Sequence, residues 1–191
     1  MDFKEHFISR EHIYKGRFID LYEDKVLLPN QKEGLRIIVD HIGAAAVLAL
    51  TPEQEVILVK QYRYAAGEVT LEIPAGKKDH KDDDPLETAK RELEEETGYV
   101  SSDWTPLGSA MGAIGFCTER VYFYLAKDCV KKENPLPPDD GEFVEVVIMP
   151  LDEAVKMVHH DQLIDAKTII TLLKAQKKCA KTTFECYNNK R

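Results

Sequence analysis

The sequence has few of the features that mark secreted or membrane-spanning proteins. Its apolar runs are shorter than a transmembrane helix requires, and no signal-peptide pattern is present at its start. No close C-x-x-C pair occurs, which argues against structural zinc and against a disulfide framework. We therefore expect a cytoplasmic protein with reduced thiols and no membrane partner. Its cysteines are Cys117, Cys129, Cys179 and Cys186.

Positive charge is also scarce. Lysine and arginine total 26 against 34 aspartates and glutamates, which gives a net charge of −8. Nucleic acid is an unsuitable partner, because neutralising its backbone requires a basic surface. An anionic small molecule would also be repelled unless divalent metal ions reversed the local field. The acidity thus gives weak support to a metal site.

The length and the 43% hydrophobic content fit one globular domain with a small appended subdomain. We place the boundary between residues 1–42 and 43–191. The first segment reads as strands at 18–28 and 35–39, joined by turns. So short a sheet cannot bury both faces alone, so it must pack on the main domain or on a second copy of the chain. Phe18 is either a core residue or an aromatic that reaches across such a dimer to stack on a base.

The main domain reads as alternating strands and helices. Residues 43–50 form a continuous apolar run, which predicts a strand covered on both faces. A long polar loop follows at 128–141, and loops of this length are usually functional or mobile. The last dozen residues read as a frayed tail, and adjacent His159 and His160 are poor joint ligands. Further strands are predicted at 56–63, 69–74, 104–107, 121–125 and 143–149, and helices from 150 and over 164–178.

One helix has marked ends, at residues 85–97. Asp84 is placed to cap its N-terminus, with Pro85 in the first turn and Glu87 completing a capping box. Gly98 supplies the left-handed residue that ends it. Leu86, Ala89 and Leu93 form its apolar edge.

Three carboxylates lie beside that apolar edge. Glu92, Glu95 and Glu96 span an arc of roughly 100° on the helix, which places them at the margin of the core. Like charges at this spacing repel one another. One interpretation is a solvated acidic face. The other is an oxygen-only site for Mg²⁺ or Mn²⁺.

The wider pattern favours the metal site. Gly76, followed by the run Arg91-Glu92-Leu93-x-Glu95-Glu96-x-Gly98-Tyr99, resembles the signature of the Nudix hydrolases. Two positions depart from it. Asp83 stands where the family has its first glutamate, after a gap one residue longer, and the final apolar position is Tyr99.

Within that family, the chain resembles the ADP-ribose pyrophosphatase branch over nearly its whole length. That branch often has a proline where this chain has Ile114, in a loop that sorts substrates in the family. The similar segments are the N-terminal strands, 61–63, 71–76, 84–87, 115–119 and Ile164-Asp165-Ala166-Lys167-Thr168.

The resemblance implies an α/β fold, an α/β/α sandwich around a mixed β-sheet, with a small N-terminal antiparallel sheet. It also implies a homodimer formed through the N-terminal strands. Mg²⁺, or Mn²⁺ in its place, would be held by Glu92, Glu96, Glu142 and the carbonyl of Ala75.

The resemblance also assigns roles in catalysis and substrate binding. Arg91 would brace the carboxylates, Glu95 would lie close by, and Glu142 or Asp140 would orient or deprotonate water. The position of this base stays open among Asp139, Asp140, Glu142 and Glu145. The expected substrate-binding residues are Arg63, Glu72, Phe18 and Arg36.

The implied reaction is metal-dependent hydrolysis of ADP-ribose to AMP and ribose 5-phosphate. The first alternative is another substrate of the same family, such as GDP-mannose, another ADP-sugar or NADH. The second is a non-catalytic ADP-ribose sensor, which usually has a degraded motif or a DNA-binding domain. The complete Arg91, Glu92, Glu95, Glu96 set disfavours the sensor.

Overall fold

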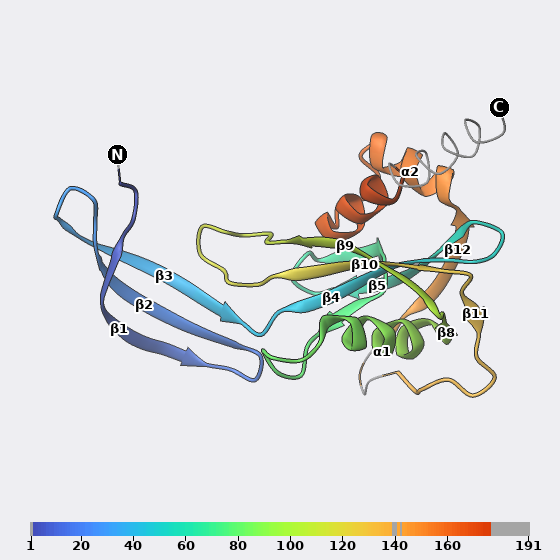
Figure 1. Ribbon diagram of the computed structural model, residues 1–191, viewed down its shortest axis with the longest axis horizontal. Helices are drawn as coiled ribbons and strands as arrows, with labels where there is room; N and C mark the ends of the chain where they lie inside the picture. The colour runs from blue at the N-terminus through green and yellow to red at the C-terminus, as the bar shows by residue number, and fades with distance from the viewer. Residues whose placement is uncertain (1, 139–140, 142, 177–191) are drawn as a thin grey trace, which may run out of the picture.

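The computed structural model describes residues 2–138, 141 and 143–176, and within them the strands form three sheets (Figure 1). An antiparallel sheet of β1 (His6–Lys15), β2 (Ile19–Leu27) and β3 (Glu33–His41) projects from one end of the molecule.

The main sheet has seven strands and is mixed, because β10 runs parallel to β4 while its other pairs are antiparallel. A third sheet pairs the two-residue strands β8 (Tyr99–Val100) and β11 (Val130–Lys131). The main sheet consists of β4 (Ala44–Leu50), β5 (Glu55–Arg63), β6 (Glu68–Glu72), β7 (Ala75–Lys77), β9 (Asp103–Ala110), β10 (Val121–Lys127) and β12 (Glu145–Pro150).

Strand β4 is buried along its whole length, as its apolar run predicts. Successive side chains of a strand point to opposite faces. Ala46, Leu48 and Leu50 accordingly enter the core that includes α2, whereas Ala45, Val47 and Ala49 enter the core that includes α1. The sheet therefore has apolar packing on both sides.

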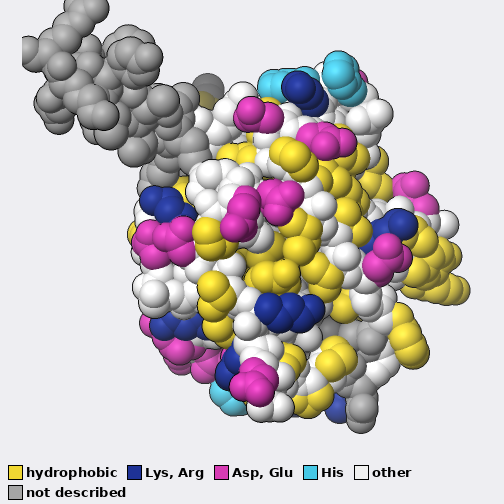
Figure 2. All heavy atoms as spheres, turned by 90° about the vertical axis from the view of Figure 1, so that its right-hand side faces the viewer, with side chains coloured by type: hydrophobic (Ala, Val, Ile, Leu, Met, Phe, Trp, Pro, Cys, Tyr) yellow, Lys and Arg dark blue, Asp and Glu magenta, His cyan; other side chains and the backbone are white. Residues whose placement is uncertain are grey.

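Helices cover both faces of the main sheet. Helix α1 (Pro85–Thr97) lies on one face, and α2 (Leu151–His159) with a further helix at 166–176 lies on the other (Figure 1). This arrangement confirms the expected α/β/α sandwich. At the end opposite the three-stranded sheet, acidic and basic side chains interrupt the hydrophobic surface (Figure 2). Among the described residues, no helix has the length and apolar character needed to cross a membrane.

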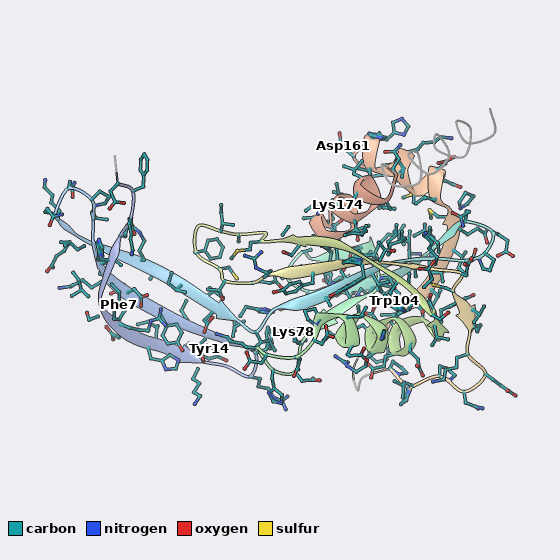
Figure 3. The ribbon with its side chains drawn as sticks, in the orientation of Figure 1. Phe7, Tyr14, Lys78, Trp104, Asp161 and Lys174 are labelled. Carbon is teal, nitrogen blue, oxygen red and sulfur yellow. The ribbon has the colours of Figure 1, made fainter. Side chains whose placement is uncertain are left out.

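The three-stranded sheet leaves many apolar side chains uncovered. Phe7 and Tyr14 of β1 are 63% and 57% exposed and lie on the projecting sheet (Figure 3). Leu35 and Ile37 of β3 are also exposed. A sheet of this size normally needs a partner on at least one face.

Two loops hold the junction between the sheets. Val39 bonds through its backbone to Phe116 and Thr118, and the Thr118 hydroxyl donates to Asp40 at 2.9 Å. Lys81 Nζ binds the same Asp40 carboxylate at 2.7 Å. The direction in which β3 leaves the main domain is therefore set by the 78–83 and 111–119 loops.

The predicted elements differ from the observed ones mainly at their ends, but strands β1 and β7 were not predicted. Strand β9 is longer than the predicted 104–107, and β12 begins at Glu145 rather than at residue 143. The two-residue strands β8 and β11 carry too little sequence pattern to be found. His159 and His160 are exposed, and the predicted tail falls outside the described residues.

Candidate active site

Helix α1 begins and ends where its sequence predicts. The Asp84 side chain accepts a hydrogen bond from the Leu86 amide at 2.9 Å, and Gly98 adopts φ +71° at the C-terminus. The capping box does not form as predicted, because the Glu87 carboxylate instead binds Lys90 Nζ at 2.7 Å. These ends fix the rotation of the helix and thus the direction of its carboxylates.

Two of those carboxylates turn inward. Glu92 and Glu96 are only 7% and 5% exposed, which excludes the interpretation of these residues as a solvated acidic face. The Ala75 amide donates to Glu96 Oε2 at 3.0 Å. The carboxylate of Glu92 lies against Gly76, where a Cβ atom would be 2.0 Å from it. Glycine at position 76 therefore leaves the space that the Glu92 carboxylate occupies.

Arg91 braces the acidic face. Its guanidinium binds Glu92 at 2.8 Å and Glu95 at 2.6 Å. Burial alone would lower the pKa of Arg91, but these two carboxylates raise it. Arg91 thus stays charged. Its guanidinium offsets the negative charge of Glu92 and Glu95 on the same helix.

The inward carboxylates border a pocket with a volume of about 520 Å³. Such a volume suits a drug-sized or nucleotide-sized ligand. Besides Glu92 and Glu96, its wall is made by Phe18, His41, Ala44, Arg63, Ala75, Gly76, Lys77, Lys78, Asp79, Arg91, Ala110, Gly112, Glu119, Val121, Phe123, Asp165, Ala166, Lys167 and Ile170.

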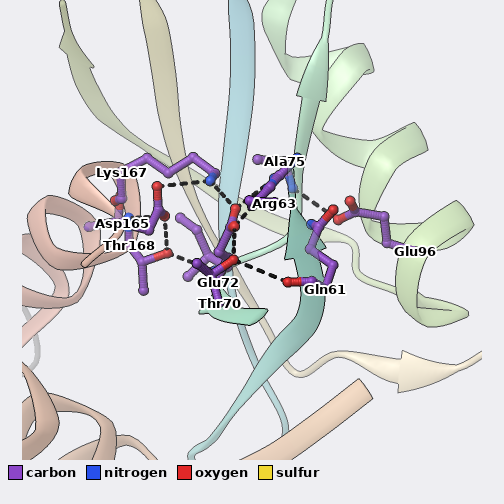
Figure 4. A network of polar contacts seen from close by, with 11 residues as sticks. Gln61, Arg63, Thr70, Glu72, Ala75, Glu96, Asp165, Lys167 and Thr168 are labelled. Carbon is purple, nitrogen blue, oxygen red and sulfur yellow. Dashed lines mark hydrogen bonds and ion pairs between the residues drawn. The ribbon is translucent and has the colours of Figure 1, made fainter. Parts of the chain in front are cut away.

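A network of charged side chains lies on the side of the pocket away from α1 (Figure 4). Arg63 binds Glu72 through two bonds of 2.7 Å, and Lys167 Nζ contacts the same carboxylate. Glu72 is only 2% exposed. Burial would raise its pKa, but the donors Arg63, Lys167 and Thr70 lower it from 4.5 to about 2. Glu72 is therefore a permanent counter-ion for two cations.

An aromatic corner forms the pocket wall next to the three-stranded sheet. Phe18 meets His41 edge to face with centroids 5.7 Å apart, and Lys77 Nζ lies 5.0 Å from the Phe18 ring. His41 Nδ1 accepts from the Gly43 amide at 2.9 Å. Burial lowers the pKa of His41, a shift that Glu119 opposes. Phe18 is 42% exposed, so its interpretation as a core residue is wrong.

The structure brings most of the predicted site residues to one pocket. Phe18, Arg63, Ala75, Arg91, Glu92 and Glu96 all line it. Glu95 lies beside it on Arg91, and Glu72 lies behind Arg63. Arg36 is not brought there within one chain, because it lies on β3 and binds Glu5. Asp140 and Glu142 fall outside the described residues.

Seven charged or titratable residues line the pocket that were not among the predicted site residues: His41, Lys77, Lys78, Asp79, Glu119, Asp165 and Lys167. Lys78 is only 6% exposed, and its ammonium donates to the backbone carbonyls of Lys81 and Asp83. It thereby closes the loop that is one residue longer than the family pattern. Lys167 lies in a segment noted only for its resemblance, and the pairing with Glu72 spans 95 positions.

The donor set fits a hard divalent cation. Two buried carboxylates, Glu92 and Glu96, lie beside the backbone of Ala75–Gly76, and carboxylate oxygens are the ligands that such a cation prefers. Among the described side chains, no three of His, Cys, Asp and Glu form a metal-holding group by themselves. A cation at Glu92 and Glu96 would therefore complete its shell with carbonyl oxygen, substrate, water or the predicted Glu142.

Comparisons with known proteins agree with this geometry. The family model for the NUDIX domain matches residues 40–172. An ADP-ribose pyrophosphatase of Bacillus subtilis (strain 168) is 44% identical over 165 residues, which cover 86% of this chain and 89% of that protein. A methanol dehydrogenase activator of Bacillus methanolicus is 42% identical over 170 residues, covering 89% and 91%.

A solved structure has the same fold. The crystal structure of an ADP compounds hydrolase aligns with a TM-score of 0.81 and covers 94% of this chain and 96% of its own. Its sequence identity is 18%, so this likeness bears on the fold alone.

Proposed function

This chain belongs to the Nudix family, and from that premise we propose that it hydrolyses ADP-ribose to AMP and ribose 5-phosphate with bound Mg²⁺. The proposal rests on one observation above all. Two buried carboxylates, Glu92 and Glu96, face the backbone of Ala75 and Gly76 at a pocket that also contains Arg63. The likeness to an ADP-ribose pyrophosphatase over most of both chains supports the choice of substrate.

The metal would be held by Glu92, Glu96, the Ala75 carbonyl and Glu142. When bound, a divalent cation neutralises a diphosphate and acidifies a coordinated water. Mg²⁺ is the proposed ion because the ligands are hard oxygens, and Mn²⁺ suits the same set. Arg91 holds the Glu92 and Glu95 carboxylates in place through its two ion pairs.

The other residues of the pocket would bind and orient the substrate. Arg63 is fixed by its two bonds to Glu72, and its remaining donors suit a phosphate oxygen. Phe18 offers a partly exposed ring to the adenine. Glu142, or Asp140 in its place, would orient or deprotonate the attacking water.

We also propose that the protein is a homodimer through residues 1–42. The exposed apolar side chains of β1 and β3 support this, because a second copy would remove them from water. On the same basis we treat residues 1–42 as a subdomain distinct from 43–191. The free thiols of Cys117 and Cys129 suit a reducing compartment, which supports a cytoplasmic location.

Initial rates on a substrate panel test the proposed activity. The panel contains ADP-ribose, ADP-glucose, GDP-mannose, NADH and diadenosine polyphosphates, each with and without Mg²⁺. We expect the highest kcat/KM for ADP-ribose, with AMP and ribose 5-phosphate as products and no turnover after chelation. A preference for GDP-mannose or NADH would instead establish the alternative substrate. Binding of ADP-ribose without turnover would establish the sensor.

A further inference from the structure

The pocket wall farthest from α1 presents an acid and a base side by side. Lys167 Nζ lies 3.0 Å from Asp165 Oδ1 at the start of the 166–176 helix. Both side chains are less than one-fifth exposed, and both line the pocket. Figure 4 shows the pair reaching toward Arg63 and Glu72, across the sheet from Glu96.

The pair is held rigidly by its neighbours. Lys167 Nζ also contacts the buried Glu72 carboxylate. The second oxygen of Asp165 accepts from the Thr168 amide at 3.0 Å and from the Thr168 hydroxyl at 2.5 Å. Thr168 Oγ1 in turn accepts from the Ile73 amide at 2.9 Å. Asp165 Oδ1 and the ammonium of Lys167 are therefore an acceptor and a donor kept at fixed positions.

Charge balance decides which part of a substrate such a pair suits. The cations Arg63 and Lys167 are matched by the carboxylates Glu72 and Asp165. A phosphate gains little from an ammonium that already binds two carboxylates. A sugar, by contrast, carries neighbouring hydroxyls, each able to donate and to accept. One hydroxyl can donate to Asp165 Oδ1 while the next accepts from Lys167 Nζ.

We propose that Asp165 and Lys167 form the subsite for the hydroxyls of the sugar at the far end of the diphosphate. The inference rests on the proposed function, which puts the diphosphate at the Glu92 and Glu96 side. The two ends of the substrate then take different walls. The adenine binds at the aromatic corner of Phe18 and His41, and the terminal sugar binds to Asp165 and Lys167.

This assignment also gives a role to each polar side chain of the segment at 164–168. Asp165 caps the helix with one oxygen and faces the pocket with the other. Lys167 binds the substrate, and Thr168 ties the helix to the loop after β6. Each of the three polar side chains thus has a separate task.

The test compares two substrates in wild type and variants. One is ADP-ribose, and the other is the tetrahydrofurfuryl ester of ADP, which keeps the diphosphate and a five-membered ring but lacks the sugar hydroxyls. Hydrogen bonds to charged groups discriminate by about 10- to 100-fold. We expect wild type to prefer ADP-ribose by that factor in kcat/KM. Lys167→Met and Asp165→Asn should reduce the preference to less than about threefold, whereas Lys167→Arg should retain part of it.

The readout is a ratio, which a merely structural role would not change. Lys174→Met on the same helix is the matched control, because Lys174 binds the Leu107 carbonyl at 2.8 Å and does not line the pocket. It should keep the wild-type ratio. Equal kcat/KM for both substrates in wild type would overturn the subsite while leaving the proposed function intact. An unchanged ratio in Lys167→Met would do the same, and hydrolysis of neither substrate would refute the proposed function.

Discussion

The carboxylate of Glu92 occupies the space that any side chain at Gly76 would need. A Cβ on residue 76 would lie 2.0 Å from the Glu92 carboxyl carbon and 2.0 Å from one of its oxygens. The conflict involves the end of a flexible side chain, so the fold can absorb it by moving Glu92. Moving Glu92 would, however, disrupt the geometry of the predicted metal site.

Gly76→Ala should therefore separate activity from stability. We expect kcat/KM on ADP-ribose to fall by about 10- to 100-fold, since disturbing the orientation of a metal ligand typically costs that factor in metal affinity or activity. The melting temperature should change by only a few degrees. Enzyme kinetics across a Mg²⁺ titration and thermal denaturation measure the two effects. Wild-type turnover at every Mg²⁺ concentration would contradict the placement of Glu92 among the ligands.

Glu96→Gln tests the second carboxylate. Glutamine keeps an oxygen for the Ala75 amide but loses the charge, so turnover at saturating Mg²⁺ should drop by orders of magnitude. Stability without metal should stay level or rise, because one of three neighbouring negative charges is removed. Glu87→Gln is the matched control on the same helix, where the carboxylate binds Lys90 instead. A fall in metal-free stability for Glu96→Gln would contradict this description of the acidic face.

The Glu72 network predicts a loss of stability in acid. The pKa of Glu72 is lowered from 4.5 to about 2 in the folded protein, so below pH 4.5 the unfolded chain binds the extra proton first. Its contribution, at most about 3 kcal/mol, is full above that pH and is lost as the pH falls toward 2. Urea unfolding at several pH values between 5 and 2.5 measures the slope. Glu72→Gln should flatten it, and an equal slope in both proteins would rule out this source.

Lys78 is expected to hold the loop that follows β7. Lys78→Met removes the donor that the carbonyls of Lys81 and Asp83 share, which should cost about 1–2 kcal/mol of unfolding free energy. The KM for ADP-ribose should rise, because Asp79 of this loop and Lys77 at the end of β7 line the pocket. Chemical denaturation measures the free energy of unfolding, and steady-state kinetics measure the KM. Lys25→Met, at an exposed pair with Glu33 on the three-stranded sheet, provides the comparison.

The proposed dimer can be tested at the uncovered surface of the three-stranded sheet. Replacing both Phe7 and Ile37 by serine removes two exposed apolar side chains and should shift a dimer toward monomer by at least tenfold in dissociation constant. Analytical ultracentrifugation over a concentration series reports the shift. A wild-type protein that sediments as a monomer at high concentration would refute the proposed dimer.

Local signals in the sequence were enough to predict α1 and its carboxylates. Asp84 and Gly98 fix the ends of the helix, and the spacing of Glu92 and Glu96 along the apolar edge fixes their direction. The run at β4 likewise identifies a strand buried on both faces. In these cases the deciding interactions lie within a few residues of one another.

Tertiary contacts decided the remainder. Nothing near Glu72 in the sequence reveals that Lys167 neutralises it, because their partnership depends on how the last helix packs. The partners of Lys78 are only three and five residues away, but its inward turn depends on an irregular loop conformation that no periodic pattern predicts. The Glu87–Lys90 pair is an exception, because it is a local i,i+3 contact in which an exposed lysine competes with the capping box for the carboxylate.

The junction at Asp40 has a consequence for how this protein can change over time. Thr118 and Lys81 anchor the outgoing strand β3, and each belongs to a loop that borders the ligand cavity. A substitution in either loop that alters the choice of ligand would also tilt the three-stranded sheet. We therefore expect substrate preference and the proposed subunit pairing to change together, and a relative that has altered one should be searched for compensating changes in the other.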